Sequence, residues 1–235
     1  MPAEPGYWAI VPAAGSGSRM GAALPKQYLR LGDRTVLEHT LDTLLGVETL
    51  AGVVLVVAPD DSTWASIRPR YAGQALEVVS GGTERCHSVL NGLDALTGKA
   101  AASDWVLVHD AARPCVRSDD IRALLAGMDA DCDGGLLGIP VADTMKRVAA
   151  DGRVTATINR SGLWHALTPQ MFRLEPLRDA LRQAIAANHL VTDEASAMEL
   201  AGYRPLMVQG HRDNIKITLP ADLALAAFYL QAEKQ

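Results

Sequence analysis

Short apolar runs alternate with helix-like segments along much of this chain. Six of these runs are expected to form strands: Trp8–Val11, Val53–Ala58, Leu76–Val79, Trp105–His109, Gly135–Val141 and Leu206–Gln209. Helical periodicity of apolar residues covers Val36–Leu45, Thr83–Leu96, Asp119–Met128, Pro176–Asn188, Asp193–Ala201 and Ala221–Gln231. This alternation predicts an α/β fold, a three-layer, mainly parallel (Rossmann-like) twisted sheet with helices on both faces. In such sheets ligands bind beyond the carboxyl ends of the strands.

One segment departs from this alternation and predicts a projecting β-hairpin arm at about residues 142–168. The β-prone runs Thr144–Val148 and Arg153–Ile158 flank Asp151-Gly152, and Asp-Gly between such runs is a strong hairpin signal. An isolated two-stranded ribbon is marginally stable in water, so the arm should pack either on its own domain or on a second subunit. The 235 residues otherwise suit one domain, which we expect to span residues 1–235.

Composition narrows the class of protein. The net charge of −5 provides no overall basic field, so we expect no nucleic-acid partner. Three cysteines without C-x-x-C spacing favour a reducing compartment over a disulfide framework. No signal peptide is visible at the N-terminus, and no apolar run approaches the ~20 residues that cross a bilayer. We therefore expect a cytoplasmic protein that does not engage a membrane.

The first apolar run leads into a glycine loop with two cations, Gly15, Gly17, Arg19 and Lys26. Glycines allow a tight turn, and free backbone N–H groups bind anions. The spacing fits neither the P-loop nor the full dinucleotide-binding fingerprint. A plain strand-to-helix turn is the alternative to a phosphate-binding loop.

The residues of this loop, taken together, resemble a known signature. Ala13-Ala14-Gly15-Ser16-Gly17-Ser18-Arg19-Met20, followed by Pro25-Lys26, is similar to the loop of nucleotidyltransferases that join a sugar phosphate or polyol phosphate to a nucleoside triphosphate. The resemblance implies that Ala13, Ala14, Gly15 and Gly17 contact the nucleotide.

Two further elements resemble one branch of that superfamily, the 2-C-methyl-D-erythritol 4-phosphate cytidylyltransferases. Gly81-Gly82-Thr83-Glu84-Arg85 with Ser88 is similar to the family's element that contacts the cytosine base, although the family commonly has an acid at the position of Thr83. Thr83 can also be a simple helix N-cap. Val106–Pro114, V-L-V-H-D-A-A-R-P, places Asp110 and Ala111 at a strand's carboxyl end. Asp110 can hold Mg²⁺ directly or indirectly, accept from a hydroxyl, or pair with Arg113.

Three later segments extend the resemblance to nearly the whole chain. These are Asp143-Thr144-Met145-Lys146, the stretch from Arg160 through Thr168 to Gln170, and Asp213–Thr218 with Lys216. The family resemblance implies that Thr144 and Arg160 reach across a homodimer to the acceptor phosphate, and that Lys216 helps to place it. The acids of Thr192-Asp193-Glu194 are expected only to start a helix.

The resemblance implies transfer of CMP from CTP to 2-C-methyl-D-erythritol 4-phosphate, with release of pyrophosphate, in the non-mevalonate route to isoprenoid precursors. It implies that Arg19, Lys26, Arg160 and Lys216 act in catalysis. The implied substrate-binding residues are Ala13, Ala14, Gly15, Gly17, Gly81, Gly82, Ser88, Asp110, Ala111, Thr144 and Thr168. Mg²⁺ is the expected cofactor. Two alternatives stay open, a ribitol 5-phosphate cytidylyltransferase and a nucleotide-binding regulator without catalysis.

Overall fold

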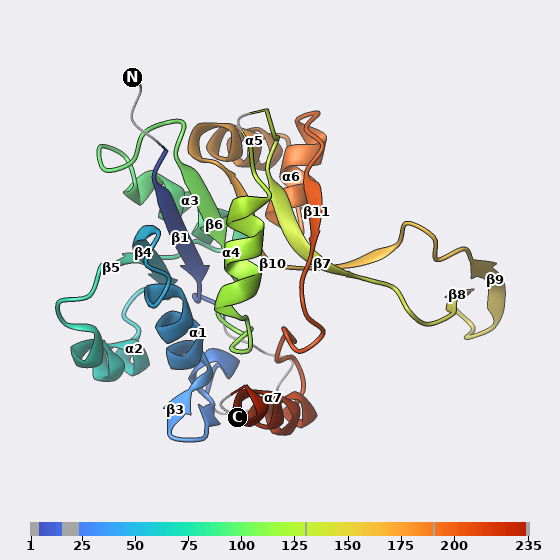
Figure 1. The fold of residues 1–235 in the computed structure, drawn as a ribbon, viewed down its shortest axis with the longest axis horizontal. Helices are drawn as coiled ribbons and strands as arrows, with labels where there is room; N and C mark the ends of the chain where they lie inside the picture. The colour runs from blue at the N-terminus through green and yellow to red at the C-terminus, as the bar shows by residue number, and fades with distance from the viewer. Residues whose placement is uncertain (1–4, 16–23, 130, 190, 234–235) are drawn as a thin grey trace.

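The fold is described by a computed structural model covering residues 5–15, 24–129, 131–189 and 191–233 (Figure 1). The strands of its main sheet are β1 (Tyr7–Pro12), β4 (Leu50–Val57), β5 (Leu76–Ser80), β6 (Trp105–Val108), β7 (Gly135–Pro140), β10 (Trp164–Arg173) and β11 (Leu206–Gln209). The α-helices are α1 (Val36–Leu45), α2 (Ser62–Ile67), α3 (Arg85–Ala95), α4 (Ser118–Ala126), α5 (Leu174–Ala186), α6 (Glu194–Leu200) and α7 (Pro220–Ala232). Short 3₁₀ turns form at η2 (Lys26–Tyr28) and η3 (Arg68–Tyr71).

The seven-stranded sheet has the order β11-β7-β10-β6-β1-β4-β5. The β1–β4, β1–β6, β4–β5 and β7–β11 pairs are parallel, whereas β10 runs antiparallel to both β6 and β7. The expected mainly parallel sheet is therefore confirmed. The antiparallel strand β10, inserted near its middle, was not among the predicted strands.

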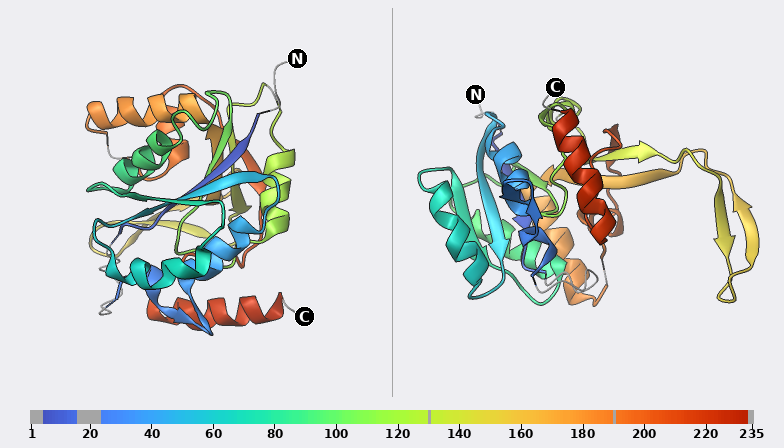
Figure 2. Two further views of the ribbon diagram at one scale, coloured as in Figure 1. Left: turned by 90° about the vertical axis from the view of Figure 1, so that its left-hand side faces the viewer. Right: turned by 90° about the horizontal axis from the view of Figure 1, so that it is seen from below.

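Helices lie on both faces of the sheet (Figure 2), and a hydrophobic cluster packs on each face. Alternate side chains of β1 face opposite layers, because successive residues of a strand point to opposite faces. Val11 packs with residues of α1, α2 and α4, including Leu41. Ile10 packs with residues of α3, α5 and α6, including Leu93. Helices thus cover both faces, as the sequence predicts.

Local sequence explains where the helices begin. Thr35 caps α1 by accepting a hydrogen bond from Glu38 N–H, and the Glu38 side chain accepts from Thr35 N–H in return. Asp193 caps α6 through Ser196 N–H, so the expected helix start at that acidic sequence is confirmed. Thr83 does not cap α3. The helix begins at Arg85, and the Thr83 hydroxyl contacts His87 instead.

The predicted hairpin projects from one side of the body (Figure 1). Its strands are β8 (Met145–Val148) and β9 (Val154–Ile158), which pair antiparallel around Gly152 at φ +82°. The arm leaves the main sheet from β7 and returns through β10, and these two strands pair with each other. No residue from 141 to 166 is buried in the structure.

Two small elements were absent from the sequence-based prediction. Helix α2 precedes the sheet edge at β5, and a two-stranded ribbon of β2 (Arg30–Leu31) and β3 (Arg34–Thr35) precedes α1. Within the described segments, no helix combines the length and apolarity needed to cross a membrane.

Candidate active site

A cavity of about 590 Å³ opens beyond the carboxyl ends of β1, β5 and β6. This is the edge at which parallel sheets of this type bind ligands. The lining residues are Pro12, Ala13, Ala14, Gly15, Lys26, Gln27, Gly82, Thr83, Glu84, Arg85, Ser88, Asp110, Ala111, Ala112 and Lys216. The first glycine loop, the Gly81-Gly82 element, the end of β6 and the Lys216 segment therefore meet at one cavity.

The glycine loop is anchored by a buried side chain that the sequence analysis did not single out. Gln27 Nε2 donates to the carbonyl oxygens of Ala13 at 2.7 Å and Gly15 at 3.0 Å. These bonds hold the start of the loop against η2, so that its backbone borders the cavity. Gly17 and Arg19 lie outside the described residues.

Lys26 lines the cavity at the first residue of η2. Its positive charge is also felt by Asp222 in α7. Burial alone would raise the pKa of Asp222, but N–H groups of Thr218 and Leu219 and the charge of Lys26 lower it. The ammonium group thus belongs to an electrostatic environment shared by the first loop and the C-terminal helix.

Gly81 and Gly82 allow close packing at the cavity wall beside the first glycine loop. A Cβ at Gly81 would lie 2.4 Å from Ala14 Cβ and 2.9 Å from Ser88 Oγ, and one at Gly82 would lie 2.5 Å from His87 Cβ. Ser88 Oγ accepts a hydrogen bond from Gly82 N–H at 3.1 Å. The wall therefore needs glycine for steric reasons, and Ser88 fixes its backbone.

Asp110 is the electrostatic centre of the cavity. Its Oδ2 lies 2.8 Å from Lys216 Nζ and 3.5 Å from Arg113 Nε, while its Oδ1 lies 3.2 Å from an Arg85 nitrogen. Burial alone would raise the pKa of Asp110, but the charges of Arg85, Lys216 and Arg113 hold it well below its usual range. Asp110 is therefore ionised at neutral pH. Its expected pairing with Arg113 coexists with its place in the site.

A hydrogen-bonded chain behind Asp110 fixes its backbone. Asp110 N–H donates to Thr168 Oγ1 at 3.1 Å, and that hydroxyl lies 3.0 Å from His109 Nδ1. His109 Nε2 lies 3.1 Å from the carbonyl oxygen of Arg113. A carbonyl can only accept, so Nε2 carries the proton and Thr168 donates to Nδ1. Burial lowers the pKa of His109 to about 4, which keeps the ring neutral at pH 7.

The segment that carries Lys216 is tied to the same centre. Ile217 N–H donates to Ala112 O at 2.8 Å, and Asn214 Nδ2 donates to Thr168 O at 2.8 Å. Arg113 donates to Asn214 O at 2.8 Å. These bonds place Lys216 against Asp110 although the two are far apart in sequence.

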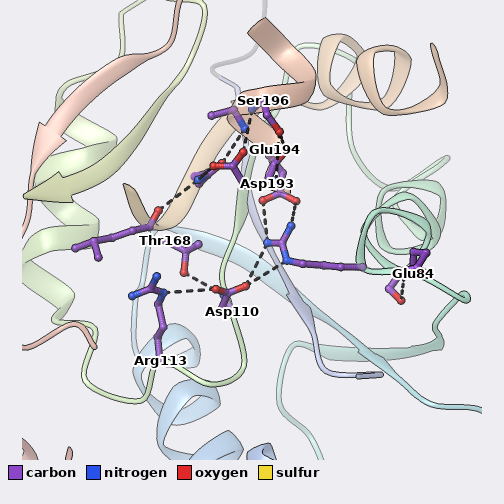
Figure 3. Close-up of polar contacts among 12 residues, drawn as sticks. Glu84, Asp110, Arg113, Thr168, Asp193, Glu194 and Ser196 are labelled. Carbon is purple, nitrogen blue, oxygen red and sulfur yellow. Dashed lines mark hydrogen bonds and ion pairs between the residues drawn. The ribbon is translucent and has the colours of Figure 1, made fainter. Parts of the chain in front are cut away.

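Arg85 joins Asp110 to a second buried carboxylate. Its two terminal nitrogens donate to Oε1 and Oε2 of Glu194 at 2.6 and 3.0 Å. Burial alone would lower the pKa of Arg85, but Glu194 and Asp110 raise it. Figure 3 shows Arg113 and Glu194 on different sides of Asp110.

A second, smaller cavity of about 170 Å³ adjoins the first. Arg85, Asp110 and Lys216 line both cavities, and Thr168, Gln170 and Asp193 line only the smaller one. The arrangement provides a large compartment and a small one that share a cationic boundary. It suits two anionic substrates that must meet.

Among the described residues, no group of three or more His, Cys, Asp or Glu side chains is arranged to hold a metal ion. Both oxygens of Asp110 already face cations. A divalent ion would therefore need most of its ligands from a substrate.

The sequence matches the family described as 2-C-methyl-D-erythritol 4-phosphate cytidylyltransferase (IspD) over residues 7–232. The chain belongs to this family. A relative in Hahella chejuensis (strain KCTC 2396) that carries the family name is 53% identical over 224 residues, 95% of this chain and 92% of the relative. A relative in Tolumonas auensis with the same name is 51% identical over 97% of this chain and 98% of its own length.

Solved structures of the cytidylyltransferase family share this fold. A crystal structure titled 4-diphosphocytidyl-2C-methyl-D-erythritol synthase aligns with a TM-score of 0.84 at 38% identity, covering 97% of this chain and all of the other. The cytidylyltransferase from Francisella tularensis aligns with a TM-score of 0.81 at 34% identity, covering 95% and 99%. Family membership makes the chain an enzyme, a nucleotidyltransferase.

Most of the predicted site residues of this cytidylyltransferase-family chain come together at the two cavities. Thr144 and Arg160 do not. They are exposed residues of the projecting arm and line neither cavity. The functional role of each predicted residue stays a prediction.

Arg85, Arg113, Glu194 and Gln27 are site residues that the sequence analysis did not assign. Arg85 and Arg113 stand inside the motifs that carried the resemblance. Their position beside assigned site residues could therefore have identified them as site residues. Nothing in the local sequence indicated that Glu194 belongs to the site, because its distance to Arg85 depends on how α6 packs against the sheet.

Proposed function

We propose that the two adjoining cavities bind CTP and 2-C-methyl-D-erythritol 4-phosphate, in the residue roles given below. As a member of the family, the chain is a cytidylyltransferase that transfers CMP from CTP to this acceptor in isoprenoid precursor biosynthesis. The observation that supports the proposed roles is the common boundary of the two cavities, formed by Arg85, Asp110 and Lys216.

The reaction joins two anions, and this explains the need for cations. An oxygen of the acceptor's phosphate attacks the α-phosphorus of CTP, and the bond from that phosphorus to the β-phosphate oxygen breaks to release pyrophosphate. A phosphate monoester is already a competent nucleophile, so positioning and charge stabilisation should supply most of the rate.

Each compartment has its own proposed set of residues. In the larger cavity, Gly15, Gly17 and the alanines Ala13 and Ala14 border the triphosphate, and Arg19 and Lys26 stabilise the charge that develops on the α-phosphate. Gly81, Gly82 and Ser88 form the side that faces the nucleoside, with Ala111 at the end of β6. Lys216 directs the acceptor phosphate, and Thr168 supports Asp110 at the smaller cavity.

The proposal includes a homodimer in which Thr144 and Arg160 enter the site of the partner. Within one chain the arm projects from the body (Figure 1), Thr144 and Arg160 line neither cavity, and the arm's apolar side chains need a surface to cover them. Met145, Val148 and Val154 are 38%, 51% and 60% exposed. A second subunit supplies such a surface and brings the two arm residues to the acceptor phosphate.

Nucleotidyltransferases of this kind generally depend on a divalent cation, and we propose Mg²⁺ for this chain. The donor set at the site fits an ion held chiefly by triphosphate oxygens, with Asp110 acting through a water molecule. Bound there, Mg²⁺ would offset negative charge on the triphosphate. The free thiols of Cys86, Cys115 and Cys132 support the proposed cytoplasmic location.

The test is pyrophosphate release from CTP and Mg²⁺ with 2-C-methyl-D-erythritol 4-phosphate, run in parallel with ribitol 5-phosphate. We expect release with the methylerythritol acceptor only. Release with ribitol 5-phosphate alone would contradict the proposed acceptor while keeping the chemistry. Folded protein that binds CTP and turns over neither acceptor would support the regulator.

A further inference from the structure

Glu194 is a fully buried carboxylate that none of the proposed steps uses. It has 0% relative exposure at the first residue of α6. Both of its oxygens face Arg85, at 2.6 and 3.0 Å. Such two-point pairing of arginine with a carboxylate is stronger than hydrogen bonding between neutral groups and fixes the relative geometry of the pair. Glu194 therefore fixes both the place and the plane of the Arg85 guanidinium.

The sheet in turn fixes Glu194. Gln170, a buried residue of β10, donates from Nε2 to Asp193 Oδ2 at 2.9 Å and accepts at Oε1 from Ala195 N–H at 2.8 Å. These bonds hold the residues on either side of Glu194. The carboxylate is thus rigidly held, because its neighbours are tied to the central sheet rather than to a surface loop.

A second edge of the Arg85 guanidinium faces Asp110. Arg85 Nε donates to Asp110 Oδ1 at 3.3 Å, and a terminal nitrogen lies 3.2 Å from the same oxygen. Arg85 also lines both cavities. A guanidinium at that place is a strong ligand for phosphate, yet each of its three nitrogens already faces one of two carboxylates.

We propose that Glu194 is a positioning residue that withholds Arg85 from phosphate and keeps it on Asp110. The inference rests on the proposed function of the site. Of the three cations around Asp110, Glu194 neutralises Arg85. Of the remaining two, Lys216 lines both cavities and Arg113 lines only the smaller one. The consequence is weaker retention of the pyrophosphate product and a fixed orientation of Asp110 beside the acceptor.

Glu194→Gln tests this proposal, because it removes the charge and keeps the shape. We expect kcat to fall, the KM for CTP not to rise, and pyrophosphate to bind about tenfold more tightly, since the released guanidinium gains a phosphate partner. Glu194→Asp, which retains the charge, should restore pyrophosphate affinity toward that of the unmodified protein. Glu199→Gln is the matched control, an exposed glutamate of the same helix, and should leave kcat, KM and pyrophosphate affinity unchanged.

A purely structural role for Glu194 predicts the opposite pattern. A loosened site would bind both CTP and pyrophosphate more weakly. Unchanged or weakened pyrophosphate binding in folded Glu194→Gln protein would therefore overturn the proposal. Calorimetry with Mg²⁺ and pyrophosphate measures this binding without turnover, so the result can be obtained even if the proposed reaction fails.

A double-mutant comparison identifies the route of the effect. If Glu194 acts through Arg85, then Arg85→Gln and the Arg85→Gln/Glu194→Gln pair should bind pyrophosphate equally. A difference of more than about threefold between them would refute action through Arg85. Because the pair removes both charges of the ion pair together, this comparison still tests the proposal if Glu194→Gln alone does not fold, since a difference between the two variants would refute it.

Discussion

Lys216 Nζ lies 2.8 Å from Oδ2 of Asp110. The carboxylate is on the loop that follows β6, and the ammonium is on the segment between β11 and α7. Asp110 therefore orients Lys216, because the ion pair limits the directions in which this flexible side chain can point. The cation is held at the boundary of both cavities before any phosphate arrives.

We expect Lys216→Ala to lower kcat by about 10²-fold, because one preorganised cation is lost from the attacking phosphate. Lys99→Ala is the matched control, since Lys99 pairs with Glu77 on the surface and lines neither cavity. Steady-state kinetics with both substrates varied provides the measurement. A kcat within about twofold of the control would remove Lys216 from the proposed mechanism.

Lys26→Ala should cost on the order of 10²–10³ in kcat, the usual loss when one charge-stabilising donor is removed. The affinity for CTP should change less than kcat, because the developing charge is larger in the transition state than in the substrate. Single-turnover rates at saturating CTP measure this. If kcat stays near normal, Lys26 does not stabilise the transition state.

Gly81→Ala should raise the KM for CTP by about tenfold or more through displacement of the nucleoside-facing wall. The added Cβ would lie 2.4 Å from Ala14 Cβ, whereas a Cβ at Gly210 would meet nothing closer than 3.5 Å. Gly210→Ala is therefore the control and should bind CTP normally. Equal CTP affinity in the two variants would show that this wall does not contact the nucleotide.

His109 should make the free energy of unfolding depend on pH between about 6.5 and 4. Its pKa in the folded protein is about 4, below the ordinary 6.5, so the unfolded chain binds the proton first and stability falls as the pH falls. The loss across this range is on the order of 3 kcal/mol. Asp110 does not mask it, because a lowered carboxyl pKa costs stability only below its usual range.

His109→Gln should flatten this dependence, and urea unfolding at several pH values measures it. His189→Gln, at an exposed histidine, should retain the slope. A variant at position 109 that keeps the full slope would assign the effect to another group.

A shared site predicts that two inactive variants restore activity when mixed. Arg160→Ala removes the arm's contribution, and Lys216→Ala removes the body's. Mixed dimers then contain one intact site, so re-equilibrated equal mixtures should reach about a quarter of normal activity by the statistics of a twofold-symmetric dimer. If the mixture is as inactive as its parts, each site is complete within one chain.

Periodicity predicted most of the main sheet because its strands are apolar and bounded by turn residues. Strand β10 was not predicted, and the reason is physical. Its sequence, Trp164–Arg173, contains Pro169, and proline argues against an interior strand. The ladder accommodates the proline through a register irregularity between Ala166 and Gln170.

The motifs predicted only those site residues that lie within the matched short stretches of sequence. Apart from Pro12 and Gln27, the residues that line the large cavity stand in the matched segments. The Arg85–Glu194 pair joins positions far apart in the chain, and no spacing rule relates them. The predicted Gly17 and Arg19 lie outside the described residues, so their placement stays a prediction.

The arm contributes no buried residue between positions 141 and 166, although both of its ends continue into the central sheet. A protease that cuts the exposed Asp151-Gly152 turn would therefore leave the hydrophobic layers of the body intact. If the arm completes a neighbouring site, such a cut would silence the enzyme while its melting temperature stays nearly the same. Inactivation and unfolding are then separable events in this protein.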